Sequence, residues 1–130
     1  MEISPSQSIE SFMPPKTDRE YGYTSFTGLP PDLVEMMRQH AIQTDVYLYT
    51  VLQDAVGDLI SHLDNMPAAQ KYEWPQARPK TGTVPYNARM EIDVLDDMRA
   101  ACERYGVKKN IFFMAALRDF LRKNGIEVEI

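Results

Sequence analysis

The sequence contains few of the residues on which metal and thiol enzymes depend. Its 130 residues include a single cysteine, Cys102, and two histidines, His40 and His62, which lie far apart. One cysteine excludes an internal disulfide, and neither C-x-x-C nor H-E-x-x-H spacing occurs. The six glycines are too sparse for a loop that cradles phosphate. These absences predict a protein that is not an enzyme and has no metal site and no cofactor.

Long apolar runs are missing as well. The longest uninterrupted run is only a few residues, and the first five residues offer neither a basic start nor an apolar stretch for export. We therefore expect no membrane partner and a cytoplasmic location. A length of 130 residues with 44% apolar side chains suits one small domain that folds alone.

Basic residues are outnumbered by acidic ones. The formal net charge is −5, so the whole chain lacks the basic footprint typical of nucleic-acid binding. The imbalance is uneven, however. Residues 22–63 hold one basic and five acidic side chains, a net charge of −4, whereas residues 84–125 hold eight basic and six acidic ones, a net charge of +2. The two halves of the chain therefore carry opposite charge.

Two segments lack the periodicity of helices and strands. Residues 1–21 place three prolines among polar and charged residues, which predicts a flexible N-terminal tail. Residues 64–83 contain three more prolines and Gly82, which interrupt any helix and predict a linker. The lone Trp74 in this linker is more typical of a residue that pins the linker to the folded body than of a ligand site.

Residues 22–63 form the first predicted unit. The stretch 23–29 is rich in β-forming residues and ends at Pro30-Pro31, which predicts a strand followed by a helix. Apolar residues recur at helical spacing over 33–41 and again over 46–63. The unit is therefore predicted as a strand, a short helix and a longer helix.

Residues 84–125 repeat this order. Polar and apolar side chains alternate strictly over 88–94, which predicts a strand with one buried face. Asp96-Asp97 then opens a short helix that ends at Gly106, and apolar positions over 111–121 predict a second long helix.

The two units superpose when the second is moved back by 65 residues without a gap. This shift lays Val94 on Leu29 and Leu117 on Leu52, and apolar residues meet apolar residues along both helices. Chance similarity of two amphipathic helix pairs is the alternative. A two-stranded ribbon needs helices to cover it, so we expect the units to share one core as one folded domain over 22–125, with Phe26 opposite Glu91 in an antiparallel pair of strands.

The stretch from Arg89 to Met98, followed by that from Glu103 to Ile111, resembles the ribbon-helix-helix proteins of the Arc/MetJ type. Members of that family are usually homodimers of one such unit. This chain resembles a fused pseudo-dimer, similar to double-unit proteins that accompany plasmid and T-DNA transfer. The resemblance implies a mainly α fold with one two-stranded antiparallel ribbon, built as a tandem ribbon-helix-helix pseudo-dimer.

The resemblance also implies a partner, double-stranded DNA, bound in its major groove. The role would be that of a repressor or of an accessory factor in plasmid and DNA transfer. The outward ribbon positions that would read bases are Thr24, Phe26 and Gly28 on one strand and Arg89, Glu91 and Asp93 on the other. Phosphate would be bound by Lys108, Lys109 and Asn110 at the start of the last helix, with Arg78 and Lys80 contributing from the linker.

Parts of the sequence fit this implied interface less well. Glu91 and Asp93 would face a polyanion, and the counterpart of the lysines in the first unit, Gln43-Thr44-Asp45, carries an acid. The alternative function is a protein-interaction module on the same scaffold. An exposed Phe26 at the ribbon centre and a protein partner for the acidic first unit would favour it.

Overall fold

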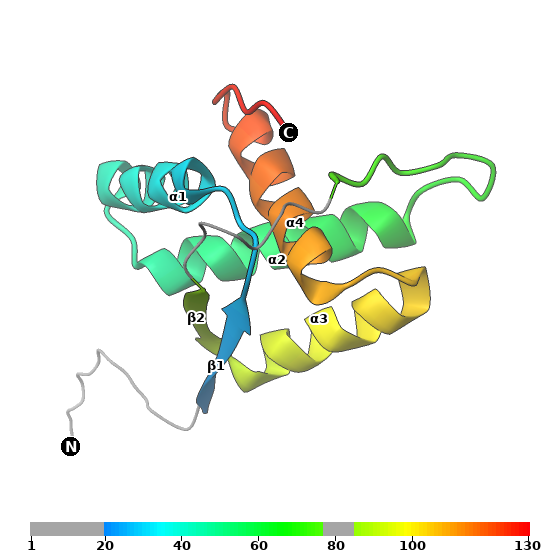
Figure 1. Ribbon diagram of the computed structural model, residues 1–130, viewed down its shortest axis with the longest axis horizontal. Helices are drawn as coiled ribbons and strands as arrows, with labels where there is room; N and C mark the ends of the chain where they lie inside the picture. Colours follow the sequence, from blue (N-terminus) through cyan, green and yellow to red (C-terminus); the bar gives the residue numbers. More distant parts are fainter. Residues whose placement is uncertain (1–19, 77–84) are drawn as a thin grey trace, which may run out of the picture.

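The computed structural model describes residues 20–76 and 85–130. Within these ranges the order strand, helix, helix occurs twice (Figure 1). The elements are β1 (Tyr21–Phe26), α1 (Pro31–Thr44), α2 (Leu48–Asp64), β2 (Tyr86–Glu91), α3 (Ile92–Tyr105) and α4 (Lys109–Lys123). A mainly helical protein with a two-stranded antiparallel sheet is confirmed for the described residues. Predictions for the tail through residue 19 and for linker residues 77–84 lie outside them.

The two strands pair antiparallel as expected, but in another register. Tyr21 lies opposite Glu91, and Phe26 lies opposite Tyr86. The predicted pairing of Phe26 with Glu91 is therefore wrong. Both strands begin two residues earlier than predicted, and β2 also ends three residues earlier, since the helix α3 already begins at Ile92 and takes Asp93 into its first turn.

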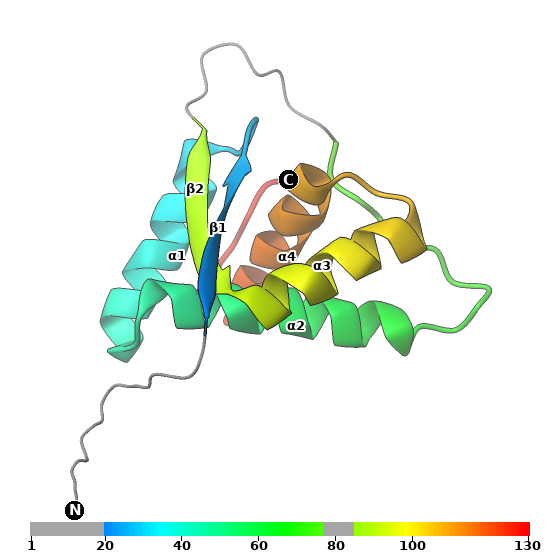
Figure 2. The same ribbon diagram turned by 90° about the horizontal axis from the view of Figure 1, so that it is seen from below.

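The inner face of the ribbon packs on the helices. Phe26, Ala88 and Met90 are fully buried, and the Phe26 ring stacks on that of Phe113 with 4.0 Å between ring centres. Because side chains alternate along a strand, this buried Phe26 moves every residue of β1 to the face opposite the predicted one. Figure 2 shows the two strands side by side, between α1 on one side and α3 and α4 on the other.

The two helix pairs share one local geometry. Each first helix ends at a residue in the left-handed conformation, Asp45 with φ 58° and Gly106 with φ 65°. The next residue, Val46 or Val107, donates its N–H to the carbonyl oxygen five residues earlier at 3.0 Å. This hydrogen bond satisfies a free carbonyl of the ending helix and turns the chain into the next one.

The spacing between equivalent elements corrects the gap-free repeat. The two strands begin 65 residues apart, but the helices begin 61 residues apart, α1 to α3 and α2 to α4 alike. The difference of four equals the length of the connection 27–30 between β1 and α1, whereas α3 follows β2 directly. Leu52 of α2 is therefore equivalent to Phe113 of α4, and Val56 is equivalent to Leu117.

The core combines side chains from both halves of the chain. In Figure 1, α4 crosses α2 near its middle, and both helices pack under the ribbon. Leu52 and Leu117, predicted as core positions, are 1% and 0% exposed. Tyr72 and Trp74 from the segment after α2 also pack against this core, as expected for Trp74. No helix within residues 20–76 and 85–130 is both long and apolar enough to cross a membrane.

Candidate nucleic-acid interface

The outer face of the ribbon presents six side chains in three facing pairs. The pairs are Tyr21 with Glu91, Tyr23 with Arg89, and Ser25 with Asn87. Tyr23, Ser25, Asn87 and Arg89 are exposed, while Tyr21 and Glu91 are half-buried. The alternation that buries Phe26, Ala88 and Met90 leaves these residues pointing away from the core. We call this set the outer face.

Arg89 is a predicted base-reading residue and lies on the outer face. Its guanidinium carbon is 4.2 Å from the centre of the Tyr21 ring and 5.5 Å from that of Tyr49, near the start of α2. Cation–π contacts of this kind hold the guanidinium group in place while its edge stays accessible. Arg89 is thus positioned by two aromatic rings rather than by an acidic partner among the described contacts.

Glu91, the acidic residue of the predicted interface, is bonded to α2. Its carboxylate accepts a hydrogen bond from the Gln53 side-chain amide at 3.0 Å, and its backbone N–H donates to the Gln53 side-chain oxygen at 2.7 Å. The paired hydrogen bonds tie the end of β2 to the second turn of α2. They also turn part of the charge of Glu91 toward the protein.

Thr24 and Phe26 were predicted to point outward, and the structure contradicts this. Thr24 is half-buried opposite the buried Ala88, and Phe26 is 0% exposed. The stack on Phe113 at 4.0 Å removes Phe26 from any surface, so it can serve neither a base contact nor a protein partner. Outward positions on β1 are instead Tyr21, Tyr23 and Ser25.

The start of α4 lies beside β1 and carries two exposed lysines. Lys109 donates from Nζ to the Thr24 hydroxyl at 2.9 Å, and the Asn110 side-chain amide donates to the Thr27 carbonyl oxygen at 3.2 Å. Lys108 occupies the N-cap position, and no side chain caps the helix. The first backbone N–H groups and two ammonium groups therefore concentrate positive potential beside the ribbon.

The start of α2 is the equivalent place in the first half and has a different chemistry. The N-cap residue is Tyr47, with Tyr49 two residues further on, and no side chain caps this helix either. The predicted counterpart of the lysines, residues 43–45, is wrong. Those residues end α1, and Asp45 forms the left-handed corner before α2. Aromatic rings thus stand where the second half has lysines.

The linker residues predicted to reach phosphate, Arg78 and Lys80, lie outside the described residues. The described part of the linker is held by a buried arginine of α4. Arg118 is 6% exposed and donates to the Asp119 carboxylate at 2.9 Å, the Tyr72 hydroxyl at 2.8 Å and the Glu73 carbonyl oxygen at 3.0 Å. Burial, together with the hydrogen bond to Asp119, raises the pKa of Tyr72 well above its usual range. This cluster fixes the chain where it leaves α2.

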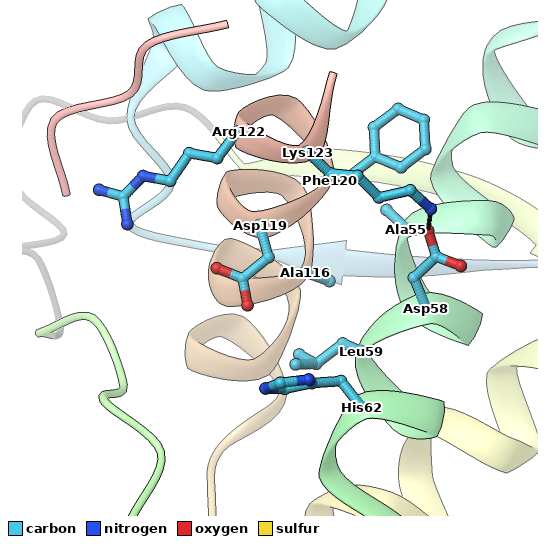
Figure 3. Close-up of a pocket in the computed structure, with 9 residues that line it drawn as sticks. All are labelled: Ala55, Asp58, Leu59, His62, Ala116, Asp119, Phe120, Arg122 and Lys123. Carbon is cyan, nitrogen blue, oxygen red and sulfur yellow. Dashed lines mark hydrogen bonds and ion pairs between the residues drawn. The ribbon is translucent and has the colours of Figure 1, made fainter. Parts of the chain in front are cut away.

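A groove of about 500 Å³ runs between α2 and α4 on another part of the surface (Figure 3). Its floor is apolar, and its rim consists of Asp58, His62, Asp119, Arg122 and Lys123. The rim charges already have partners: Lys123 bonds Asp58 at 2.7 Å, and Arg122 donates to the carbonyl oxygens of Val128 and Ile130. These contacts join α2, α4 and the C-terminal segment, which indicates a structural role.

Neither histidine belongs to a catalytic arrangement. His40 packs edge-on against Phe120 at 5.4 Å, and His62 packs against Tyr72 at 6.0 Å between ring centres. Burial raises the pKa of the Cys102 thiol, which lowers its fraction of reactive thiolate. Across residues 20–76 and 85–130, no three histidine, cysteine or acidic side chains gather in a way that would hold a metal ion.

Tyr23, Ser25, Asn87 and Tyr47 are surface residues that the sequence reasoning missed. For Asn87 a signal was present, because Pro85 lacks an N–H donor and is a natural start for a strand that alternates from Tyr86 onward. The tyrosines gave no such signal, since aromatic residues fall on both faces of β1. Comparison of the chain with protein-family models, curated proteins and solved structures finds no match.

Proposed function

We propose that this chain is a DNA-binding protein, a tandem ribbon-helix-helix pseudo-dimer that presents its outer face to the major groove of duplex DNA. The observation that carries the proposal is the contact of Lys109 with Thr24 at 2.9 Å. It fixes a basic helix start, free of side-chain caps, beside a strand whose other face is polar and exposed. Phosphate binding at such a helix start sets the position of a protein on DNA, and the ribbon then lies over base edges.

The exposed polar residues of β2 supply chemistry suited to base edges. Asn87 and Arg89 are two residues apart and so point to the same side of the ribbon. Arginine pairs with two acceptors of guanine, and asparagine pairs with a donor and an acceptor of adenine. Ser25, opposite Asn87, adds a hydroxyl that suits either base. These residues replace Thr24 and Phe26 in the proposed contact.

The charge distribution supports an uneven contact. The second half has a net charge of +2 and supplies Arg89, Lys108 and Lys109, whereas the first half has a net charge of −4. Phosphate contacts would therefore come mainly from the second half. Repression and assistance in plasmid transfer, the two roles that the resemblance implies, both require this contact and no catalysis.

Salt-dependent binding tests the proposal. Fluorescence anisotropy with a mixed pool of duplex fragments should show affinity that falls as salt rises, because bound phosphates release counterions. Replacing Lys108 and Lys109 together by Ala should weaken binding to every sequence. It should also reduce the slope of log affinity against log salt by up to about two, since each phosphate contact contributes about 0.9.

The matched control removes the same charge elsewhere. Lys71→Ala combined with Lys123→Ala alters residues in the segment after α2 and in the last turn of α4, and it should leave the slope unchanged. Arg89→Ala should cost about 1–3 kcal/mol on a preferred site and little on random DNA, because it acts on base choice. Absence of salt-sensitive affinity for any duplex at low ionic strength would contradict the proposal.

A protein-interaction module is the second candidate, and a new observation favours it. Phe26 no longer supports it, but Ile42, Val46 and Tyr47 are 64%, 44% and 75% exposed around the corner between α1 and α2. Exposed apolar residues in an acidic half suit a basic protein partner. Under this function the wild type binds no duplex at any salt concentration, and Ile42→Asp abolishes association with the partner while leaving the fold intact.

A further inference from the structure

Four tyrosines and one arginine form a continuous surface that joins the ribbon to the start of α2. They are Tyr21, Tyr23, Tyr47, Tyr49 and Arg89, which we call the aromatic strip. Arg89 lies over the Tyr21 ring at 4.2 Å, Tyr21 meets Tyr49 edge-on at 5.3 Å, and Tyr49 stacks with Tyr47 at 5.7 Å and 16° between planes. Tyr23 lies opposite Arg89 in the strand pair.

The two ends of the aromatic strip are open to solvent. Tyr23 is 71% exposed and Tyr47 is 75% exposed, the highest values among the exposed large apolar side chains of the described residues. Rings this exposed contribute little to the core, so packing does not account for them. Between them, Arg89 keeps its guanidinium plane over tyrosine rings instead of in an ion pair of the described set.

We infer that the aromatic strip binds unpaired nucleobases, and that the preferred ligand is a duplex adjoining single-stranded DNA. This inference rests on the proposed DNA-binding function and names its substrate class. Tyrosine rings and guanidinium planes stack on the faces of bases. In a duplex those faces are covered by neighbouring base pairs, and a groove exposes only base edges. Open ring faces therefore fit bases that have left the stack.

The position of the aromatic strip connects it with the proposed duplex contact. Tyr21, Tyr23 and Arg89 belong to the same outer face as Ser25 and Asn87, so the two surfaces are continuous. Lys108 and Lys109 stand at the start of α4 beside Thr24 and Phe26, toward one end of the ribbon, while Tyr47 and Tyr49 stand at the start of α2, whose second turn is bonded to Glu91 at the other end. A strand that crosses the ribbon would pass from a phosphate-binding end to a base-stacking end.

Binding of matched DNA ligands tests the inference. One labelled duplex is prepared with blunt ends and again with a thymine-rich single-stranded extension, and both are titrated with the full chain at one salt concentration. The extension should tighten wild-type binding by about fivefold to about 150-fold for each stacked base. A fluorescent base analogue placed in the extension should be quenched on binding, which reports stacking directly.

Paired variants separate stacking from other contacts. Tyr23→Ala with Tyr47→Ala should remove the gain and the quenching while leaving blunt-duplex affinity within about twofold, because both rings lie outside the core. Tyr23→Phe with Tyr47→Phe should keep both signals, since the ring faces remain. Circular dichroism should show unchanged melting for both pairs.

Several results would overturn the inference. Equal wild-type affinity for the two duplexes would do so, as would loss of the gain in the phenylalanine pair, which would assign it to the hydroxyl groups. An equal loss of blunt-duplex affinity in the alanine pair would make the tyrosines groove contacts. These outcomes leave the proposed function standing. Absence of binding to every DNA ligand would end both, and would favour a protein as the partner of the aromatic strip.

Discussion

The two helix pairs of this chain have the same backbone geometry but different surroundings. In both pairs a 14-residue helix ends at a left-handed residue, and the next long helix begins three residues later without a side-chain cap. Around this shared frame, α4 buries nine residues and α2 buries six. The frame is set by local hydrogen bonds, whereas burial depends on what the rest of the chain places against each helix.

The segment after α2 accounts for much of this difference. It must lead back toward β2, and it lies against α4, where Trp74 comes within 6.0 Å of Phe112 between ring centres. Arg118 on α4 binds this segment, while its equivalent 61 residues earlier is Gly57, which is exposed on α2. A fused pair of units is therefore asymmetric, because one connection has no counterpart.

The largest expected effects concern the equivalent core positions Phe113 and Leu52. Phe113→Ala should lower the free energy of unfolding by about 3–5 kcal/mol, since it removes a fully buried ring that stacks on Phe26. Leu52→Ala should lower it by about 2–5 kcal/mol. Urea denaturation measures both, and Tyr23→Ala is the exposed control. A wild-type stability for Leu52→Ala would contradict the assigned equivalence of the two helices.

The next effect separates the two surfaces of the long helices. Arg118→Met should destabilise by about 1–3 kcal/mol, because the Tyr72 hydroxyl and the Asp119 carboxylate lose a buried partner. Asp119 is 35% exposed, which limits the cost through solvation. Trp74 is the single tryptophan, so its emission should shift to the red as the segment loosens. Unchanged emission would show that Arg118 does not hold the segment. Tyr72→Phe is the milder control.

Exchanging the residue types at the two left-handed corners should give effects of opposite sign. Gly106→Ala places a side chain at φ 65° and should cost about 1–2 kcal/mol. Asp45→Gly removes a side chain at φ 58° and should stabilise by a few tenths of a kcal/mol, since aspartate tolerates this conformation better than most residues. Thermal unfolding followed by circular dichroism measures both. Equal signs would mean that the corners are not equivalent.

The smallest expected effect is a gain at Gly57. A Cβ atom built there meets no atom within 4 Å, and the residue lies inside α2. Gly57→Ala should therefore stabilise by at most about 1 kcal/mol through helix propensity alone. The midpoint of urea unfolding would record it. A loss of stability would reveal a neighbour at this position, and the contrast with Arg118 would weaken.

The order of elements was predictable because it depends on local periodicity. Alternation over Tyr86 to Glu91 and apolar spacing along the four helices indicated two strand-helix-helix runs, and Arg89 was placed on the outer face by the same alternation. The end of β2 was missed because alternating residues up to Val94 satisfy a strand pattern as well as a helix start. The four extra residues between β1 and α1 were missed because a gap-free comparison cannot reveal an insertion.

By itself, the sequence determined that two strands pair antiparallel and that four amphipathic helices cover one side of them. It could not determine which face of β1 is buried, because tyrosines at 21 and 23 compete with the phenylalanine at 26 on the other face. The tertiary structure decides this through Phe113, 87 residues further along the chain, whose ring stacks on Phe26. The candidate surface follows from that one contact, since burying Phe26 turns the tyrosines outward beside Arg89.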